Sequence, residues 1–217
     1  MAKVLVIRLS AIGDVAMTVP VIYSAAKANP EDSFTVLTQA FLMPLFMNRP
    51  PNVEVIGINT KGAEKGLIGL LKFISALLKF DFDVILDLHN VIRTIIICTF
   101  FRLNGKRVFV LNKARKERKR LTAIKGKRLY PLRPVIVRYA DVFRAAGLNY
   151  TETFTSLYEE SPAELSGMAS VAGIKKGKWI GVAPFAKHRG KIYPVDKAAA
   201  KAKAKALAKG KSLGVLI

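Results

Sequence analysis

Three short segments combine acidic, basic and small residues in a way that could support chemistry. They are Ser10–Asp14, Asp87–Arg93 and Ala183–Lys191. The first offers a carboxylate, Asp14, that could act as a base. The third is rich in cations and glycine, which suits a loop that binds phosphate groups. A base facing such a loop suggests transfer of a group from a nucleoside diphosphate to a hydroxyl.

Asp14 and Gly13 also fit a purely structural interpretation. Asp is a preferred N-cap, because its carboxylate accepts hydrogen bonds from the free N–H groups of a helix start. Gly13 would then provide a positive φ or allow close packing. The turn carries neither a Gly-x-Gly-x-x-Gly pattern nor a Walker lysine, so it is not a nucleotide fingerprint. The cap and the base both stay open as roles for Asp14.

The other polar residues of these segments can be explained without a catalytic role. His89 is interpreted as a turn residue rather than a catalytic one. Arg93 lies in the first turn of an expected helix, where contact with a ligand and simple solvation are equally open. His188 and Arg189 are expected to be exposed to solvent.

The elements that must position these segments alternate between strand and helix. Strands are expected at 3–9, 33–37, 53–58, 83–88 and 107–111, and helices at 15–26, 39–47, 66–80, 91–102 and 138–146. This alternation predicts an α/β fold with a doubly wound parallel sheet. Ligands of such sheets bind outside the carboxyl ends of the strands, and Asp14 follows the first of them.

A second α/β domain is expected to begin after a polar connection. A strand is expected at 179–183, a loop at 184–194, a helix from Val195 and a further strand at 212–217. The predicted organisation is therefore a first domain over 1–150, a connection over 151–177, and the start of a second, incomplete domain over 178–217.

The expected helix at 66–80 is apolar nearly all round, with Lys72 and Lys79 as its only charges. Packing against the sheet is the favoured interpretation. The alternative is a helix at a membrane surface, with both lysines at the lipid headgroups.

Positive charge is concentrated in two places. The chain has 36 Lys and Arg against 15 Asp and Glu, a net charge of +21. Residues 106–128 hold eleven basic residues and one acid, Glu117, and residues 197–211 hold six lysines and no acid. Such patches attract phosphorylated substrates, anionic membranes or nucleic acid. The Ala/Lys run at 198–211 lacks an apolar stripe, and we assign it no function.

Composition bounds the remaining possibilities. Hydrophobic residues make up 51% of the chain, enough for a sizeable core. The single cysteine, Cys98, lies in an apolar run and is expected to be a buried small hydrophobe, which fits a reducing compartment. Neither a signal peptide nor an uncharged stretch long enough for a membrane span is expected.

Four stretches of the sequence resemble the lipopolysaccharide heptosyltransferases, glycosyltransferase family 9. The first is Val6–Val15 with Thr18-Val-Pro20, and the second is Asp83–Arg93. The third is the Arg138-Tyr139 helix that ends at Gly147. The fourth is Ile180–Pro184 leading to Gly190–Pro194. Their order and spacing agree over essentially the whole chain.

The resemblance implies a GT-B fold of two Rossmann-like domains facing a cleft. It implies an enzyme that transfers heptose from ADP-heptose, with inversion and without a metal or cofactor. The acceptor would be Kdo or a heptose of the inner core, on lipid A at the anionic inner membrane surface, placing the protein in the cytoplasm and peripheral to that membrane.

On the family's pattern, Asp14 matches the base and Lys191 the cation at the donor diphosphate. Lys187, in the same cation-rich loop, is also assigned to the donor phosphates. Ser10 and Gly13 match the acceptor-side loop, and Arg93 is assigned to the acceptor. The family's later donor-binding segments would lie beyond Ile217, so adenine and ribose contacts are not assigned.

Two other functions stay open from the sequence. One is nucleic-acid binding through residues 106–128, although no helix-turn-helix, zinc or RNA-recognition signature is present. The other is a sugar-nucleotide-binding remnant without catalysis. A phosphorylated lipid acceptor accounts for the same charge more economically, so no nucleic-acid partner is expected.

Overall fold

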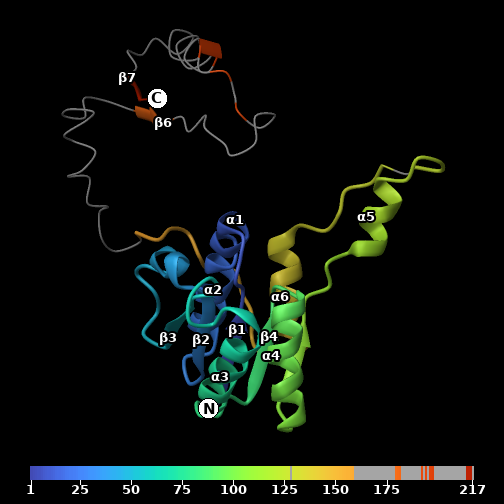
Figure 1. Ribbon diagram of the computed structural model, residues 1–217. Helices are drawn as coiled ribbons and strands as arrows, with labels where there is room; N and C mark the ends of the chain where they lie inside the picture. Colours follow the sequence, from blue (N-terminus) through green and yellow to red (C-terminus); the bar gives the residue numbers. More distant parts are fainter. Residues whose placement is uncertain are drawn as a thin grey trace. The chain divides into compact units, whose positions relative to one another are not determined.

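The computed structural model describes residues 1–127, 129–158, 179–181, 192, 194, 196–197 and 214–216. Strands and helices alternate along the first part of the chain (Figure 1). In chain order these elements are β1 (Lys3–Ile7), α1 (Ile12–Ala16), α2 (Val19–Ala28), β2 (Ser33–Gln39), the 3-10 helix η1 (Ala40–Leu45), β3 (Val53–Ile58), α3 (Gly66–Leu78), β4 (Val84–Asp87), α4 (Ile92–Leu103), β5 (Arg107–Val110), α5 (Arg115–Leu121) and α6 (Val135–Ala145).

The five strands form one parallel sheet in the order β3-β2-β1-β4-β5. The chain first winds outward from β1 to β3, and then returns to add β4 on the other side of β1. The strand order therefore reverses between β1 and β4. In open α/β sheets this switch point is where ligands bind, outside the carboxyl ends of the strands.

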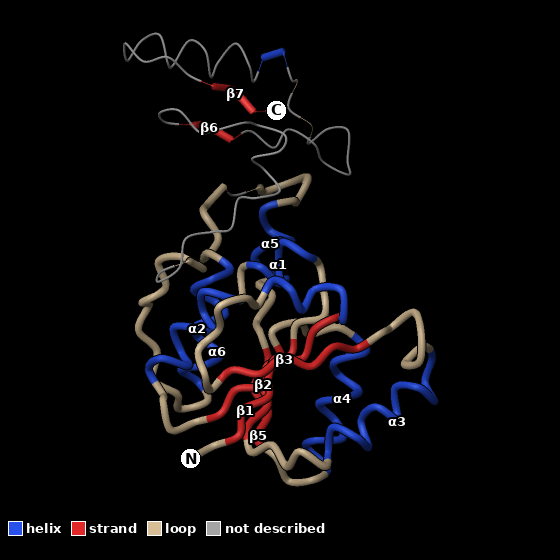
Figure 2. The backbone as a smooth tube through the Cα atoms, turned by 90° about the vertical axis from the view of Figure 1, so that its left-hand side faces the viewer, coloured by secondary structure: helices blue, strands red, loops and turns tan. Residues whose placement is uncertain are grey.

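Helices cover both faces of the sheet (Figure 2). Side chains alternate along β1, so Val4 and Val6 pack against α2 and α6, while Leu5 and Ile7 pack against α3 and α4. All four of these β1 side chains are fully buried. The prediction of a doubly wound parallel sheet is confirmed, and its first strand is buried on both faces.

The region after β1 differs from the sequence prediction. The structure has two helices, α1 and α2, where one helix over 15–26 was expected. Met17 and Thr18 separate them. The Thr18 hydroxyl donates to the Val15 carbonyl at 2.6 Å, and Pro20 occupies the first turn of α2. Since proline has no N–H and fits only a helix start, the second helix begins afresh here.

The segment over 39–47 also differs in detail, because it is a 3-10 helix with Pro44 inside it. The last helix of this part begins at Val135, directly after Pro134, rather than at Arg138. Its predicted end is confirmed, since Gly147 follows with a φ of 83°.

The chain divides into two units, Met1–Glu159 and Glu160–Ile217. The described part of the second unit contains β6 (Trp179–Gly181) and β7 (Gly214–Leu216), which pair in parallel. Both strands fall within ranges where the sequence predicts strands.

Residues 106–128, which we call the basic segment, contain a helix, α5, that the sequence pattern did not suggest. No residue of α5 is buried, and Figure 1 shows it standing away from the sheet. Its last turn holds Arg118, Lys119 and Arg120, where positive charge complements the helix dipole.

Candidate functional site

The switch point of the sheet places two short segments side by side. Ile7 and Asp87 are paired residues at the ends of β1 and β4, and the Leu88 N–H donates to the Ile7 carbonyl at 3.0 Å. The residues just beyond these ends, Arg8 after β1 and Leu88 and His89 after β4, therefore leave the sheet at neighbouring positions. This edge is where the fold favours a ligand site.

Arg8 is a buried cation at this edge, with 6% of its surface exposed. One guanidinium nitrogen, Nη1, donates to the Leu88 carbonyl at 2.7 Å, and the other, Nη2, contacts Asp14 Oδ2 at 2.5 Å. The guanidinium carbon lies 5.9 Å from the ring centroid of Tyr139. Arg8 thus joins the ends of β1 and β4 to α1 and α6 through one planar group.

Asp14 is held by this contact rather than by a capping role. It is the third residue of α1, whose N-cap is Ala11, and no side chain caps this helix start. The N-cap interpretation of Asp14 is therefore wrong, because the carboxylate turns to Arg8 instead of the helix N–H groups. The Asp14 side chain keeps 43% of its surface exposed, and Oδ1 has no hydrogen-bond partner among the described residues.

Gly13 shows no structural need for glycine. Its φ is not positive, and an added Cβ would meet nothing within 4 Å. The alternatives of positive φ and close packing are therefore both wrong. The open space leaves the α1 backbone accessible beside Asp14.

Ser10 and His89 meet across the switch point. The Ser10 hydroxyl lies 3.4 Å from His89 Nε2, and Nδ1 of the same ring is buried without a partner among the described residues. Burial is the main cause that lowers the pKa of His89 to about 4. The cations Arg8 and Lys113 lower this pKa further, whereas the Asp14 carboxylate raises it. The imidazole is therefore neutral at pH 7 and donates or accepts toward Ser10 according to its tautomer.

The fold should lose stability through His89 as the pH falls. In the unfolded chain the imidazole takes up a proton near pH 6.5, but in the fold only near pH 4. Between pH 6.5 and about pH 4 the unfolded state therefore binds more protons than the folded state. Lowering the pH through this range shifts the folding equilibrium toward the unfolded state. His89→Gln should flatten the fall in melting temperature between pH 7 and pH 4.5. Parallel curves for variant and wild type would show that His89 does not titrate this way.

Asp87 has a structural role in the second segment. It is fully buried, and its Oδ1 accepts hydrogen bonds from the N–H groups of His89 and Asn90, each at 2.8 Å. Its Oδ2 accepts from the Thr94 hydroxyl at 2.8 Å. With both oxygens occupied, this carboxylate shapes the turn that carries His89 and does not face a ligand.

Two further residues of this edge, Lys113 and Tyr139, were not assigned to the site from the sequence. Burial lowers the pKa of Lys113, helped by Arg115 and Arg8 and opposed by Asp87 and Asp14. Tyr139 is fully buried and its pKa is raised, chiefly by burial. Lys113 could have been suspected, since it lies just beyond the strand expected at 107–111 and so at the same edge. Tyr139 was named only as part of the helix that resembles the heptosyltransferases, without a role in the site.

Arg93 lies in the first turn of α4, as expected, and is half-buried. Its Nη1 donates to the Glu64 carbonyl at 3.1 Å. The contact joins the start of α4 to the loop before α3, and it engages one side of a guanidinium that has five N–H donors.

The predicted donor-side residues Lys187 and Lys191 lie outside the described residues, as do His188 and Arg189. Cys98 is buried, and burial raises its pKa to about 12, as expected of an inert thiol. Within the described ranges, no cluster of His, Cys, Asp and Glu suits a metal ion. No helix described here has the length and hydropathy to cross a membrane.

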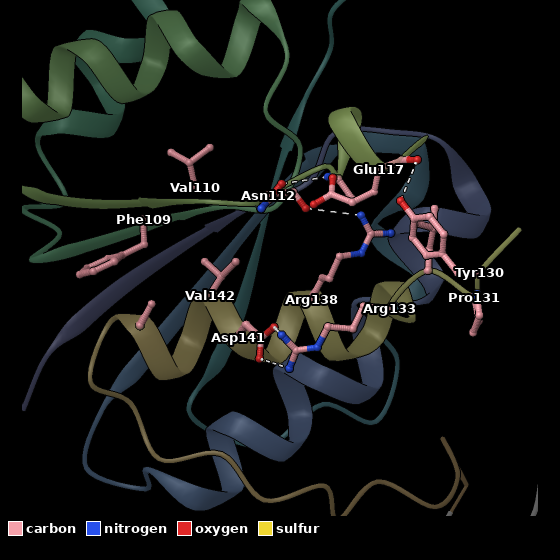
Figure 3. A pocket seen from close by; sticks show the side chains of 13 residues that line it. Phe109, Val110, Asn112, Glu117, Tyr130, Pro131, Arg133, Arg138, Asp141 and Val142 are labelled. Atoms are coloured by element: carbon pink, nitrogen blue, oxygen red, sulfur yellow. Dashed lines mark hydrogen bonds and ion pairs between the residues drawn. The ribbon is translucent and has the colours of Figure 1, made fainter. Parts of the chain in front are cut away.

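A pocket of about 450 Å³ lies between β5, the start of α5 and α6 (Figure 3). Arg138 reaches into it and donates to the Asn112 carbonyl at 3.4 Å, while its buried Nε has no partner among the described residues. Arg133 pairs with Asp141 at 2.7 Å at the same pocket. Arg138 and Tyr139 are consecutive residues of α6. One turn of this helix therefore lines the pocket through Arg138 and contacts Arg8 through Tyr139.

Comparison with known proteins identifies the fold. No family model matches the chain, and neither does any curated protein. Among solved structures, a glycosyl transferase family 9 protein from Veillonella parvula matches 99% of the chain with a TM-score of 0.69 and 19% identity. The Escherichia coli heptosyltransferase WaaC with ADP matches 99% at 0.58 and 18%, and the E. coli ADP-heptose LPS heptosyltransferase II matches 98% at 0.62 and 20%.

These likenesses confirm the predicted α/β fold of GT-B type. The chain spans 62%, 66% and 63% of the lengths of these three proteins, in the order given. At such identities the likeness concerns the fold, and function must be argued from the site.

Proposed function

We propose that this protein is a glycosyltransferase that moves a heptose from ADP-heptose to the inner core of lipopolysaccharide, onto Kdo or another heptose. The observation that carries the proposal is the Asp14 carboxylate at the switch point, fixed through Oδ2 and open at Oδ1. Support comes from the fold, which is shared with heptosyltransferases, one of them solved with ADP.

In the proposed reaction Asp14 is the general base. The acceptor hydroxyl gives its proton to Oδ1 while its oxygen attacks the anomeric carbon of the heptose. Attack comes from the face opposite the diphosphate, so the configuration inverts. The bond from that carbon to the diphosphate oxygen breaks, and its electron pair leaves with ADP. No metal or cofactor takes part in these steps.

The acceptor sugar is assigned to the α1 side of the edge. A Cβ added at Gly13 would meet nothing within 4 Å, so the backbone beside Asp14 is open on the side assigned to the sugar. Ser10, beside His89, offers a hydroxyl for a second hydrogen bond. Arg93 is assigned to an acidic group of the acceptor, through the donors that Glu64 does not engage.

The donor diphosphate is assigned to Lys191, with Lys187 beside it. A cation that meets the negative charge developing on ADP is often the largest catalytic contribution. This assignment rests on the sequence and the family resemblance alone. The protein is placed in the cytoplasm, peripheral to the anionic inner membrane that holds the acceptor.

The direct test is an assay for heptosylated product and released ADP, with ADP-heptose and lipid A–Kdo as substrates. Transfer would establish the activity. ADP binding without transfer to this or to a heptosylated acceptor would identify a non-catalytic sugar-nucleotide-binding protein. Tight, salt-dependent binding to DNA, with no ADP binding, would favour a nucleic-acid partner instead.

The basic segment is expected to serve the acceptor and the membrane. Five cations of α5 are to be neutralised together: Arg115, Lys116, Arg118, Lys119 and Arg120. Since basic residues near an anionic surface contribute on the order of 1 kcal/mol each, vesicle binding should weaken and the KM for a lipid-linked acceptor should rise. ADP affinity should not change. Both effects should shrink at high salt, because screening shortens the reach of the charges.

The charge-neutralised protein also separates the alternatives for this segment. Unaltered vesicle binding and acceptor KM would leave α5 with a role in solubility only. Loss of DNA binding in the same variant, with acceptor kinetics intact, would move nucleic acid ahead as the partner.

A further inference from the structure

Helices α3 and α4 lie side by side on one face of the sheet, as Figures 1 and 2 both show. The inner side of α3 buries Leu70, Ile74 and Leu77 against the sheet, at the spacing of one helix face. This confirms the favoured interpretation that the helix packs on the sheet. It also leaves the outer side of an almost wholly apolar helix facing solvent.

That outer side carries large apolar side chains. On α3, Leu67, Ile68 and Leu71 are 60%, 74% and 38% exposed, and on α4, Ile92 and Leu103 are 80% and 77% exposed. We call the outer side of these two helices the α3/α4 face. Single exposed apolar residues are ordinary, but several on the outer side of two neighbouring helices point to an interaction surface.

The charged side chains within α3 and α4 are all positive. Neither helix contains an acidic residue, while Lys72 and Arg102 lie exposed on them. The residues that flank α3 include Lys65 and Lys79 but also Glu64 and Asp81, and Asp81 is paired with Lys106. Apolar side chains bordered by lysine and arginine are the pattern of helices that lie in a membrane interface. Anionic headgroups complement this charge, and acyl chains complement the leucines and isoleucines.

A second copy of the chain fits this face less well. The interface of a two-fold dimer is self-complementary, with the same patch on both subunits. It would bring the cations of one α3/α4 face against those of its partner. An anionic bilayer has no such conflict.

The position of the face relates it to the candidate site. Both helices begin at the carboxyl edge of the sheet, where Asp14 lies, and the contact between Arg93 and the Glu64 carbonyl joins their starts. A lipid surface on the first turns of α3 and α4 would therefore lie at the same edge as the carboxylate.

We propose that the α3/α4 face is a membrane-docking surface, which inserts Leu67, Ile68 and Leu71 among the lipids while Lys72 and Lys79 contact anionic headgroups. This proposal rests on the proposed function, because a lipid-linked acceptor is the reason that the protein would need to bind a membrane. The cations of α5 would act from a distance on the same membrane, whereas the α3/α4 face supplies the apolar contact.

The test compares two triple variants of the full chain. Leu67→Ser, Ile68→Ser and Leu71→Ser together remove the apolar contact. The matched control combines Phe41→Ser, Met43→Ser and Met47→Ser, whose side chains are 70%, 37% and 40% exposed on and beside η1. Co-sedimentation with vesicles of phosphatidylglycerol and phosphatidylethanolamine, and with neutral phosphatidylcholine vesicles, measures binding. Melting temperatures check that both variants fold.

The α3 variant should bind anionic vesicles at least about tenfold more weakly, equivalent to about 1.4 kcal/mol, while the control keeps wild-type binding. Lys72→Glu with Lys79→Glu should also weaken binding, and this pair tests the face without touching its apolar residues. Equal vesicle binding by wild type and the α3 variant would overturn the proposal, as would an equal loss in the control. So would a wild-type dimer in sedimentation velocity that the α3 variant dissociates.

Activity separates this proposal from the proposed function. With a lipid-free acceptor, the α3 variant should transfer heptose at the wild-type rate, because Asp14 and its neighbours are untouched. If the wild type binds vesicles through this face but transfers heptose to no acceptor, the proposed function fails and the docking surface stands.

Discussion

Asp14→Asn is expected to lower the turnover of heptosyl transfer by about 10²- to 10⁴-fold, the usual contribution of a general base. The amide cannot take the proton of the acceptor hydroxyl, yet it has nearly the size and shape of the carboxylate. ADP affinity should therefore stay at the wild-type value. Product formation and ADP binding are the two measurements.

The fold should survive this substitution. The side chain is 43% exposed, and the amide oxygen can still accept a hydrogen bond from Arg8 Nη2. Asp81→Asn is the matched control, since Asp81 also pairs with a cation, Lys106, but lies before β4 at the opposite edge of the sheet. Full turnover in the Asp14 variant would place the base elsewhere, and a large drop in melting temperature would give Asp14 a structural role.

The sheet could be predicted because each strand is marked by a short run of aliphatic residues in the sequence itself. Runs of buried aliphatic residues recur at intervals that fit strand-helix units, and the paired residues Ile7 and Asp87 lie within two such runs. The end of β1 could be predicted as a ligand-binding edge for the same reason. Asp14 was found because it directly follows that strand and its turn.

The contacts that give the site its chemistry could not be predicted in this way. Arg8 reaches the Leu88 carbonyl across 80 positions of sequence, and Tyr139 packs on it from α6. Only the register of β1 with β4 brings these groups together. A basic residue after an aliphatic run carries no local sign that it will be buried.

The N-cap interpretation of Asp14 failed for a related reason. Capping preferences describe a carboxylate whose only partners are the N–H groups of its own helix. Here a buried guanidinium competes for that carboxylate, and a charge-assisted hydrogen bond is stronger than a neutral one. The break between α1 and α2 at Thr18 was missed although Pro20 was visible, because both helices are apolar enough to appear as one.

Arg8→Lys is expected to lower turnover by about ten- to a hundredfold, because a displacement of the base by about 1 Å has effects of that order. A guanidinium holds the Leu88 carbonyl and Asp14 Oδ2 at once in a fixed plane, whereas an ammonium on a flexible stem does not. Turnover should fall while ADP affinity stays constant. Arg49→Lys is the control, since Arg49 also donates to a backbone carbonyl, that of Val53.

A double-mutant cycle decides whether Arg8 acts through Asp14. If Arg8 only positions the base, Arg8→Lys should cost little further turnover once Asp14→Asn is present, since there is no base left to misplace. The melting temperature, in contrast, should respond to Arg8→Lys in both backgrounds, because the Leu88 carbonyl is affected either way. An equal loss of turnover in both backgrounds would mean that Arg8 contacts the substrate or stabilises the edge of the sheet on its own account.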